Sequence, residues 1–215
     1  TVVAAVIATL VVSTVVALHE RYRSDALDVH FLSVGQGDSA VLRLPGGPIA
    51  VVDGGLPGRG AMVVAPFLRR ARVRRIDYLV VTHAQDDHAG GVAELLDEVE
   101  IGELWTAAGD CEVESFARLR EAARARGVTV VDVGSSVLPV RRGDGWRLAA
   151  LPPRDARGAC GDNDRSVVVA AEFAGRRVLL GGDIEARAEA ALVGTVGAAG
   201  LDADAARATL TAAAL

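Results

Sequence analysis

One short segment of the sequence carries its clearest chemical signal. Residues 82–91 have the sequence THAQDDHAGG and include two of the four histidines of the chain. Imidazole and carboxylate groups this close together are the nitrogen and oxygen ligands that divalent metals of borderline hardness prefer. We therefore predict a metal site in this segment, with five candidate side chains: His83, Gln85, Asp86, Asp87 and His88.

The elements around this segment indicate how it would be positioned. Residues 76–81 (IDYLVV) form a nearly continuous apolar run, which predicts a strand covered on both faces, and residues 90–99 have helical spacing. The segment thus follows the C-terminal end of a buried strand, a frequent ligand position in layered α/β proteins. The competing interpretation is that Asp86 or Asp87 only caps the helix and that the histidines are surface residues.

Short apolar runs separated by turn signals continue along the chain. Residues 39–53 and 166–183 echo each other, because each forms a strand, a glycine turn and a second strand that ends at Asp53 or Asp183. Two β-rich halves with helices between them predict an α/β (α+β) fold, an αββα sandwich. The predicted strands are 27–33, 40–44, 49–52, 76–81, 128–133, 146–151, 167–173 and 177–180, and the predicted helices are 62–73, 90–99, 115–126 and 185–192.

Composition places these motifs in one folded domain. The chain has 215 residues, 51% of them hydrophobic and 24% charged, with a net charge of −5. These values exclude disordered and collagen-like chains, and the acidic balance argues against a protein that coats duplex DNA. Cys111 and Cys160 lack the CxxC spacing of zinc ribbons and thioredoxin-like sites, and they either pair in an oxidising compartment or stay as buried thiols.

The N-terminal segment has a different character. Residues 1–18 contain no charge, no glycine and no proline, and as a helix they would be about 27 Å long, close to the ~30 Å hydrocarbon core of a bilayer. We predict a transmembrane helix there, with a signal peptide and a buried core helix as alternatives. Arg21 and Arg23 directly after it weakly favour a cytoplasmic flank.

Several motifs stand in a fixed order along the chain. They are VGQGDS at 34–39, DGG at 53–55, the HxxxDHxGG pattern within 83–91, NDRS at 163–166 and LLGGDIE at 179–185. Together they resemble the metallo-β-lactamase superfamily and, within it, the soluble domain of ComEC-type DNA-uptake proteins, over roughly residues 25–200. The resemblance implies the αββα fold, preceded by a membrane helix.

The resemblance also assigns roles to individual residues. It implies that a divalent metal, Zn or Mn, binds as one or two ions to His83, Asp87, His88 and Asp183, with Gln85 where the family usually has a histidine. Asp87 or Asp86 would accept the proton from the attacking water. Asp53 would support the site or serve only as a strand-end turn residue. The loop 35–38 would face a phosphate or form only a tight turn. The other supporting or substrate-binding candidates are Gly35, Gln36, Gly37, Asp38, Asn163 and Ser166.

Two departures from the family pattern shape the expected domain boundaries. No histidine follows His88, and the last residues do not continue the family pattern, so we expect a piece of a longer protein without the final strand and helix. The expected division is a transmembrane helix at 1–18, a joint at 19–26, the metallo-β-lactamase-like domain at 27–200 and a truncated or divergent tail at 201–215.

The implied function is DNA uptake during natural transformation, with hydrolysis of phosphodiesters in incoming, single-stranded DNA. The implied partners are that DNA, the membrane and the rest of a transmembrane channel, with the domain on the outer face of the inner cell membrane. Alternatives are a metallo-hydrolase of small esters or lactams and a non-catalytic binding module. An arginine run would follow DNA phosphates or form a solvated helix face: Arg69, Arg70, Arg72, Arg74 and Arg75.

Overall fold

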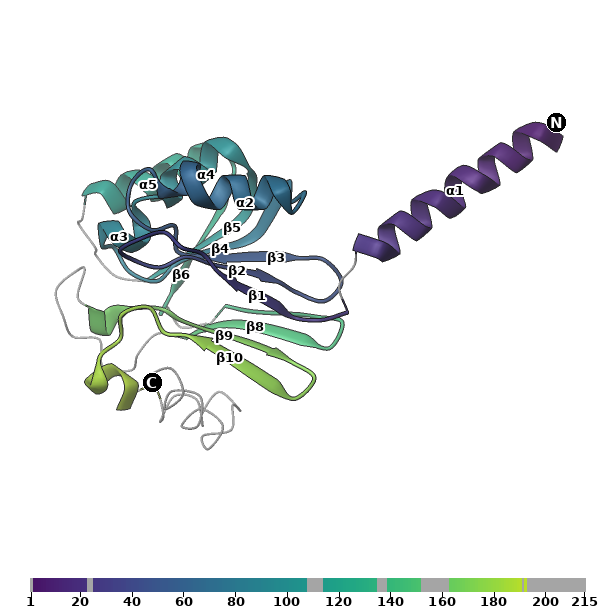
Figure 1. Ribbon diagram of the computed structural model, residues 1–215. Helices are drawn as coiled ribbons and strands as arrows, with labels where there is room; N and C mark the ends of the chain where they lie inside the picture. Colours follow the sequence, from purple (N-terminus) through teal and green to yellow (C-terminus); the bar gives the residue numbers. More distant parts are fainter. Residues whose placement is uncertain are drawn as a thin grey trace.

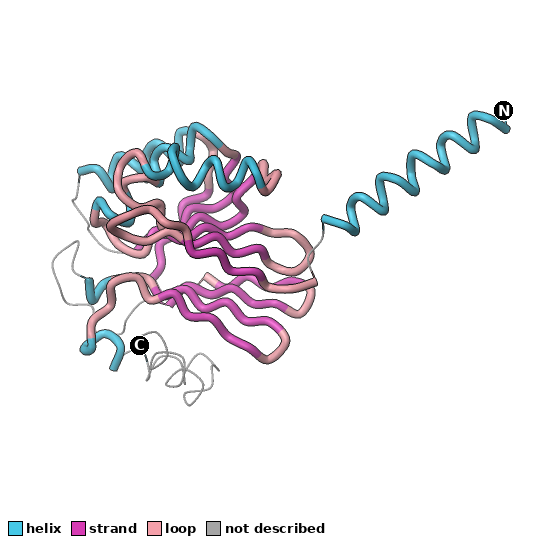
Figure 2. Tube along the Cα trace, viewed as in Figure 1, coloured by secondary structure: helices cyan, strands magenta, loops and turns pink. Residues whose placement is uncertain are grey.

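Two β-sheets packed face to face form the body of the protein. In the computed structural model the described residues are 2–22, 25–107, 114–134, 139–151, 163–190 and 192. Helices cover the outer face of the larger sheet (Figures 1 and 2). Cys111, Cys160 and the tail at 201–215 lie outside the described residues, so the predictions made for them stay predictions.

The larger sheet has six strands in the order β1-β2-β3-β4-β5-β6. The first three strands pair antiparallel, whereas β3 to β6 pair parallel. Parallel neighbours need crossover connections, which the helices of the outer layer provide. The strands are β1 (Asp28–Phe31), β2 (Ala40–Arg43), β3 (Ile49–Val52), β4 (Arg75–Val81), β5 (Glu100–Ala107) and β6 (Thr129–Val133). The helices are η1 (Gly60–Val64), α2 (Ala65–Arg70), α3 (Asp86–Ala89), α4 (Val92–Glu98) and α5 (Glu114–Ala125).

The smaller sheet is antiparallel, in the order β10-β9-β8-β7. Its strands are β7 (Val140–Gly143), β8 (Trp146–Leu151), β9 (Val168–Phe173) and β10 (Arg176–Leu180), with the short helix η2 (Asn163–Arg165) before β9. Residues 186–190 are helical after β10. The two echoing segments of the sequence are thus the hairpins β2–β3 and β9–β10, one in each sheet.

The alternation of side chains along β4 explains its continuous apolar run. Leu79 and Val81 belong to the cluster packed under the helices, whereas Val80 belongs to the cluster between the sheets. All three are 0% exposed. Complete burial of such a side chain stabilises the fold by about 1.5–3 kcal/mol, so this strand anchors both layers of the core. Its C-terminal end is therefore a rigid place from which to present a functional loop.

Several elements differ from the sequence predictions. The expected helix at 62–73 is divided into η1 and α2, and that at 90–99 begins only at Val92. Strand β5 was not predicted, because Glu100, Gly102 and Glu103 interrupt its apolar pattern. The two glutamates pair with arginines far away in the sequence, Glu100 with Arg75 and Glu103 with Arg141. Strand β7 was not predicted either.

Helix α1 spans Val2–Tyr22 and extends away from the two sheets (Figure 1). None of the helices within the described ranges combines the length and apolar character that crossing a membrane requires. The transmembrane segment expected at residues 1–18 is therefore not confirmed, although most of these residues are helical.

Candidate metal centre

Strand ends from both sheets meet at one place. Asp53 directly follows β3, and His83 lies two residues after the end of β4. Ser166 precedes β9, and Asp183 follows β10. A backbone hydrogen bond from Val167 N to Thr82 O (2.8 Å) connects the two sheets at this point. The fold thus brings four chain segments, far apart in the sequence, to one edge of the sandwich.

Three potential metal ligands gather there. One ligand atom from each of His83, His88 and Asp183 lies within 4.8 Å of the other two. His88 Nε2 is 3.2 Å from Asp183 Oδ1, and the two imidazole rings have centroids 4.2 Å apart. Both histidines are buried, whereas the Asp183 side chain is 37% exposed and opens the cluster to solvent.

The chemistry of this cluster fits a divalent ion. His83 Nε2 is buried and has no hydrogen-bond partner among the described residues. A buried polar atom without a partner costs about 1–3 kcal/mol, and a metal ion bound there would remove that cost. Three protein ligands with one open position are also the pattern of catalytic zinc sites. These observations support His83, His88 and Asp183 as metal ligands.

Asp53 holds His88 in the orientation that a ligand needs. Asp53 Oδ2 lies 2.9 Å from His88 Nδ1 and accepts a hydrogen bond from Thr82 Oγ1 (2.8 Å), while Oδ1 accepts one from Thr82 N (2.8 Å). A carboxylate on one imidazole nitrogen directs the other nitrogen towards a metal. Asp53 has a φ of +61°, a conformation that aspartate tolerates better than most residues. The geometry favours a supporting role for Asp53 over that of a mere turn residue.

The His83 ring is held in place by two hydroxyl groups near its Nδ1 atom. Its Nδ1 lies 3.0 Å from Thr82 Oγ1 and 3.3 Å from Ser166 Oγ. Ser166 is fully buried, and so is Thr82. Both hydroxyl groups therefore orient the ring so that Nε2 points to the cluster. The sequence analysis included Ser166 but missed Thr82, whose only signal is its position at a strand end beside a histidine.

The two histidines have opposite electrostatic environments. Burial and the neighbouring His88 lower the pKa of His83, which favours its neutral form. Burial also acts to lower the pKa of His88, but the hydrogen bond and charge of Asp53, with the charge of Asp183, outweigh it and raise that pKa to about 9. His88 therefore holds a proton at neutral pH, which an incoming metal ion would have to displace.

The loop at 35–38 packs directly against the histidine-containing segment. Asp38 N donates a hydrogen bond to Asp87 O (3.3 Å), and Gln36 Nε2 donates to Asp87 Oδ2 (3.4 Å). A Cβ on Gly37, which has a φ of +89°, would lie 1.8 Å from that same carbonyl oxygen. Gly35, at φ +84°, lies against the guanidinium of Arg59. The loop therefore needs glycine for close packing, and the amide of Asp38 is already used within the protein.

The carboxylates of this region occupy distinct positions. Asp87 is partly buried against Gln36 and lies outside the three-ligand cluster, and Asp86 is exposed at the first turn of α3.

Burial is the largest of the causes that raise the pKa of Asp38, with the charges of Asp53, Asp183 and Asp87 adding to it and His88 opposing it. Asp38 is therefore electrostatically coupled to the cluster, which the VGQGDS motif alone did not indicate.

Gln85 connects the histidine-containing segment to the second sheet. Its Nε2 donates a hydrogen bond to Asn163 Oδ1 (2.7 Å), and Asn163 Nδ2 donates to Glu185 Oε1 (3.4 Å). A side-chain hydrogen bond with Gln85 acts to raise the pKa of His83, although burial and His88 outweigh it. Gln85 is not part of the three-ligand cluster, so its position fits a bridging role between the two sheets.

Comparisons with known proteins agree with this arrangement. The profile described as metallo-beta-lactamase superfamily matches residues 32–215. The chain is 28% identical over 182 residues to ComE operon protein 3 of Bacillus subtilis, a match that covers 75% of this chain and 23% of that protein. The chain thus spans less than a quarter of the length of this relative.

Among the solved structures that the chain resembles at low sequence identity, one supports the fold. A metallo-beta-lactamase superfamily protein of Sulfolobus tokodaii matches with a TM-score of 0.50 at 15% identity, covering 80% of this chain and 76% of that one. A metallo-beta-lactamase from Pontibacter korlensis matches with a TM-score of 0.37 at 14% identity, covering 66% of this chain and 60% of that one. The first of these supports a mixed α/β architecture of this type.

Proposed function

The chain belongs to the metallo-β-lactamase superfamily, and we propose that it is a metal-dependent hydrolase that cleaves phosphodiester bonds in DNA entering the cell. The observation that carries the proposal is the buried His83 Nε2, which has no hydrogen-bond partner in the part of the chain that the structure describes and lies in one cluster with His88 and Asp183. The resemblance to ComEC-type DNA-uptake proteins, together with the 28% identical relative, supports DNA as the substrate.

The proposed ligands of a first ion, zinc or manganese, are His83, His88 and Asp183. When bound, the ion would supply Lewis-acid activation of water and neutralisation of phosphate charge. Asp87 is the proposed additional ligand for a second ion, with Gln85 as a weaker candidate. Neither belongs to the three-ligand cluster, so their part in metal binding rests on the resemblance.

The protein residues around the cluster would each make a defined contribution. Asp53 fixes the tautomer of His88, and Thr82 with Ser166 fixes the ring of His83. Asp87 is the proposed acceptor of the proton from the attacking water, with the exposed Asp86 as the alternative. Asp38, whose pKa is raised mainly by burial, would accept or hold a proton close by.

The supporting candidates fall into two groups in this proposal. Gln36, Gly37 and Asp38 position the histidine-containing segment through Asp87, and Gly35 begins their loop. Asn163 lies between Gln85 and Glu185 and would approach the substrate from the second sheet. We also propose attachment to the inner cell membrane, with the domain on its outer face and the rest of a channel protein as its partner.

The test uses the full chain after metal removal with EDTA. Addition of Mn²⁺ or Zn²⁺ should restore cleavage of a single-stranded oligonucleotide, and mass spectrometry should find about one or two bound ions per chain. Asp183→Asn should lose most of the cleavage and of the bound metal. An exposed carboxylate distant from the cluster, Glu121, provides the control variant Glu121→Gln.

Two outcomes would contradict the proposal. Hydrolysis of small esters or lactams without cleavage of DNA would make the protein a hydrolase of small substrates. Retention of much less than one equivalent of metal, with no effect of His83→Ala on any activity, would make it a non-catalytic binding module.

A further inference from the structure

The end of the molecule opposite the metal centre is rich in arginine. Two hollows lie there, with volumes of about 390 Å³ and 590 Å³. Each is lined by four arginines and by one carboxylate, Asp77 in the first hollow and Glu172 in the second. We call these eight residues the basic end: Arg43, Arg72, Arg74, Arg75, Arg142, Arg147, Arg176 and Arg177.

Strand direction separates the basic end from the metal centre. Strand β4 begins at Arg75 and leads to His83, and β10 begins at Arg176 and leads to Asp183. Strand β4 has seven residues, and at a rise of ~3.3 Å per residue its first and last residues lie roughly 20 Å apart. None of the eight arginines belongs to the metal-ligand cluster, so a role in holding the metal does not account for them.

The arginines outnumber the carboxylates around them. Arg147 and Arg177 share Glu172 as an ion-pair partner, and Arg75 pairs with both Asp77 and Glu100. Further carboxylates at the same end are Asp28 beside Arg43, Asp25 just before β1, and Asp144 in the β7–β8 turn. Arginines of the helical layer near this end also pair, Arg69 with Glu98 and Arg126 with Asp97. The excess of positive charge stands out in a chain whose net charge is −5.

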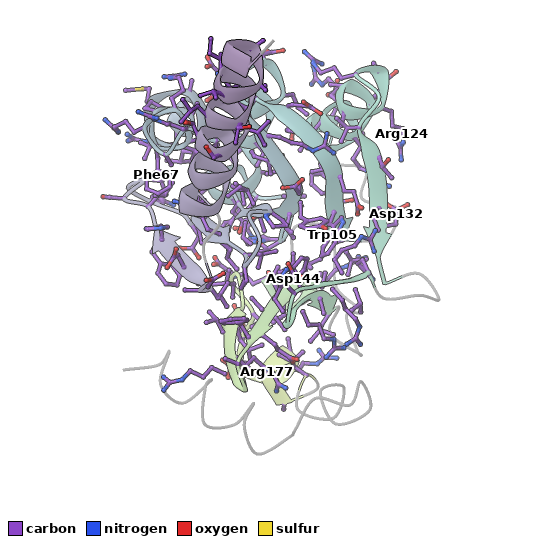
Figure 3. The ribbon with its side chains drawn as sticks, turned by 90° about the vertical axis from the view of Figure 1, so that its right-hand side faces the viewer. Phe67, Trp105, Arg124, Asp132, Asp144 and Arg177 are labelled. Carbon is purple, nitrogen blue, oxygen red and sulfur yellow. The ribbon has the colours of Figure 1, made fainter. Side chains whose placement is uncertain are left out.

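Helix α1 leaves the domain from this same end. It precedes β1, whose first residue, Asp28, pairs in register with Arg43. Figure 3 looks onto this end, with α1 towards the viewer and with Asp144 and Arg177 labelled below it. The helix carries a set of uncovered apolar side chains, which are 52–62% exposed: Val6, Ile7, Leu10, Val11 and Val12.

We propose that the basic end docks on an anionic membrane surface. Guanidinium groups bind lipid phosphates with charge-assisted hydrogen bonds. The uncovered apolar side chains of α1, at the same end, would be buried at the boundary between the headgroups and the acyl chains. The metal centre then faces away from the membrane. This assignment rests on the proposed membrane location, but it does not require that the protein hydrolyses DNA.

The test measures binding of the full chain to two kinds of vesicle without any DNA. The first kind contains phosphatidylcholine alone, and the second also contains phosphatidylglycerol. The test variant replaces three exposed arginines of the basic end: Arg74→Gln, Arg142→Gln and Arg176→Gln. The control variant makes the same change in net charge with three arginines away from this end: Arg59→Gln, Arg118→Gln and Arg187→Gln.

The wild-type chain should bind the anionic vesicles more tightly than the neutral ones. The test variant should lose roughly tenfold or more of its affinity for the anionic vesicles, while the control variant should stay within about twofold of wild type. Binding to neutral vesicles should be the same for all three proteins. Circular dichroism and thermal unfolding should show that all three are folded.

Three results would overturn the assignment. Equal losses in the test and control variants would indicate a general effect of net charge. Equal binding of wild type to both kinds of vesicle would exclude headgroup recognition. A test variant with unchanged vesicle binding but weaker binding of single-stranded DNA would make the basic end a nucleic-acid surface. Because no outcome depends on cleavage, failure here is distinct from failure of the proposed hydrolase.

Discussion

His88 Nδ1 lies 2.9 Å from the carboxylate of Asp53, although the two residues are 35 positions apart in the sequence. This contact joins the end of β3 to the segment after β4, and both side chains are only 1% exposed. The same carboxylate also receives two hydrogen bonds from Thr82. Asp53 therefore links the stability of the fold to the orientation of a proposed metal ligand.

The first prediction concerns this carboxylate. Asp53→Ala should lower the free energy of unfolding by about 3–5 kcal/mol, because it leaves buried donors of His88 and Thr82 without an acceptor. Urea denaturation of the metal-free chain measures the change. Asp86→Ala, an exposed change in the same region, should stay within about 1 kcal/mol of wild type. Equal effects of the two changes would contradict the proposed role of Asp53.

The second prediction is a pH dependence of stability without metal. His88 has a pKa of about 9 in the folded protein, above its ordinary value of 6.5. Protonated His88 therefore adds on the order of 3 kcal/mol to the free energy of unfolding. This stabilisation is fully present below about pH 6.5 and is lost as the pH rises through about 9. The pKa of His83 is lowered in the folded protein, so its effect on stability has the opposite sign. Neutral His83 favours the folded state above about pH 6.5, and this stabilisation is lost as the pH falls below that value.

Denaturation in EDTA between about pH 7 and pH 10 separates the His88 effect from that of His83, whose lowered pKa keeps it neutral over that range. Stability of the wild-type chain should fall across this range. His88→Gln should be less stable at pH 7 but much less dependent on pH. A wild-type stability that rises towards pH 10 would show that the sign is wrong.

The third prediction concerns stabilisation by metal. Zinc in excess should raise the stability of the wild-type chain, by about 2.7 kcal/mol when its free concentration is one hundred times the dissociation constant. His83→Ala removes the buried Nε2 of the cluster and should abolish this gain. His30→Ala, which removes an exposed histidine packed on Phe67, should keep it. A full gain in His83→Ala would exclude His83 as a ligand.

The fourth prediction separates steric from conformational effects at Gly37. Gly37→Ala would place Cβ 1.8 Å from the Asp87 carbonyl oxygen, so the loop must move away from the histidine-containing segment. We expect a loss of at least about 2 kcal/mol in unfolding free energy. Gly127, with a φ of +77°, has open space around its Cβ position, so Gly127→Ala reports the conformational cost alone. Similar losses in both variants would mean that the close contact with Asp87 contributes little.

Local sequence pattern predicted the part of the site that lies close together in the chain. His83 and His88 stand five residues apart after a strongly apolar strand, and both signals are local. Asp53 and Asp183 were found because each ends one of two similar hairpins. The ligand role of Asp87 was implied by the family resemblance and stays a prediction. Its hydrogen bond with Gln36 joins segments far apart in the sequence, and local pattern does not encode such a contact.

The elements that were missed depend on long-range partners. Strand β5 includes Glu100 and Glu103, and these are acceptable in a central strand because Arg75 and Arg141 pair with them. Thr82 acquires its role only when the fold brings Asp53 to its hydroxyl group and Val167 N to its carbonyl oxygen. Pairing between segments is a property of the folded chain, so periodicity along one segment does not reveal it.

The three clustered side chains do not come from one sheet. His83 and His88 follow β4 of the larger sheet, and Asp183 follows β10 of the smaller one, while Val167 N and Thr82 O connect the sheets beside them. A bound ion would therefore add a cross-link between two sheets whose strands pair only within each sheet. Neither sheet is a metal-binding module by itself, so a polypeptide divided between β6 and β7 would recover the site only by reassociation of both fragments.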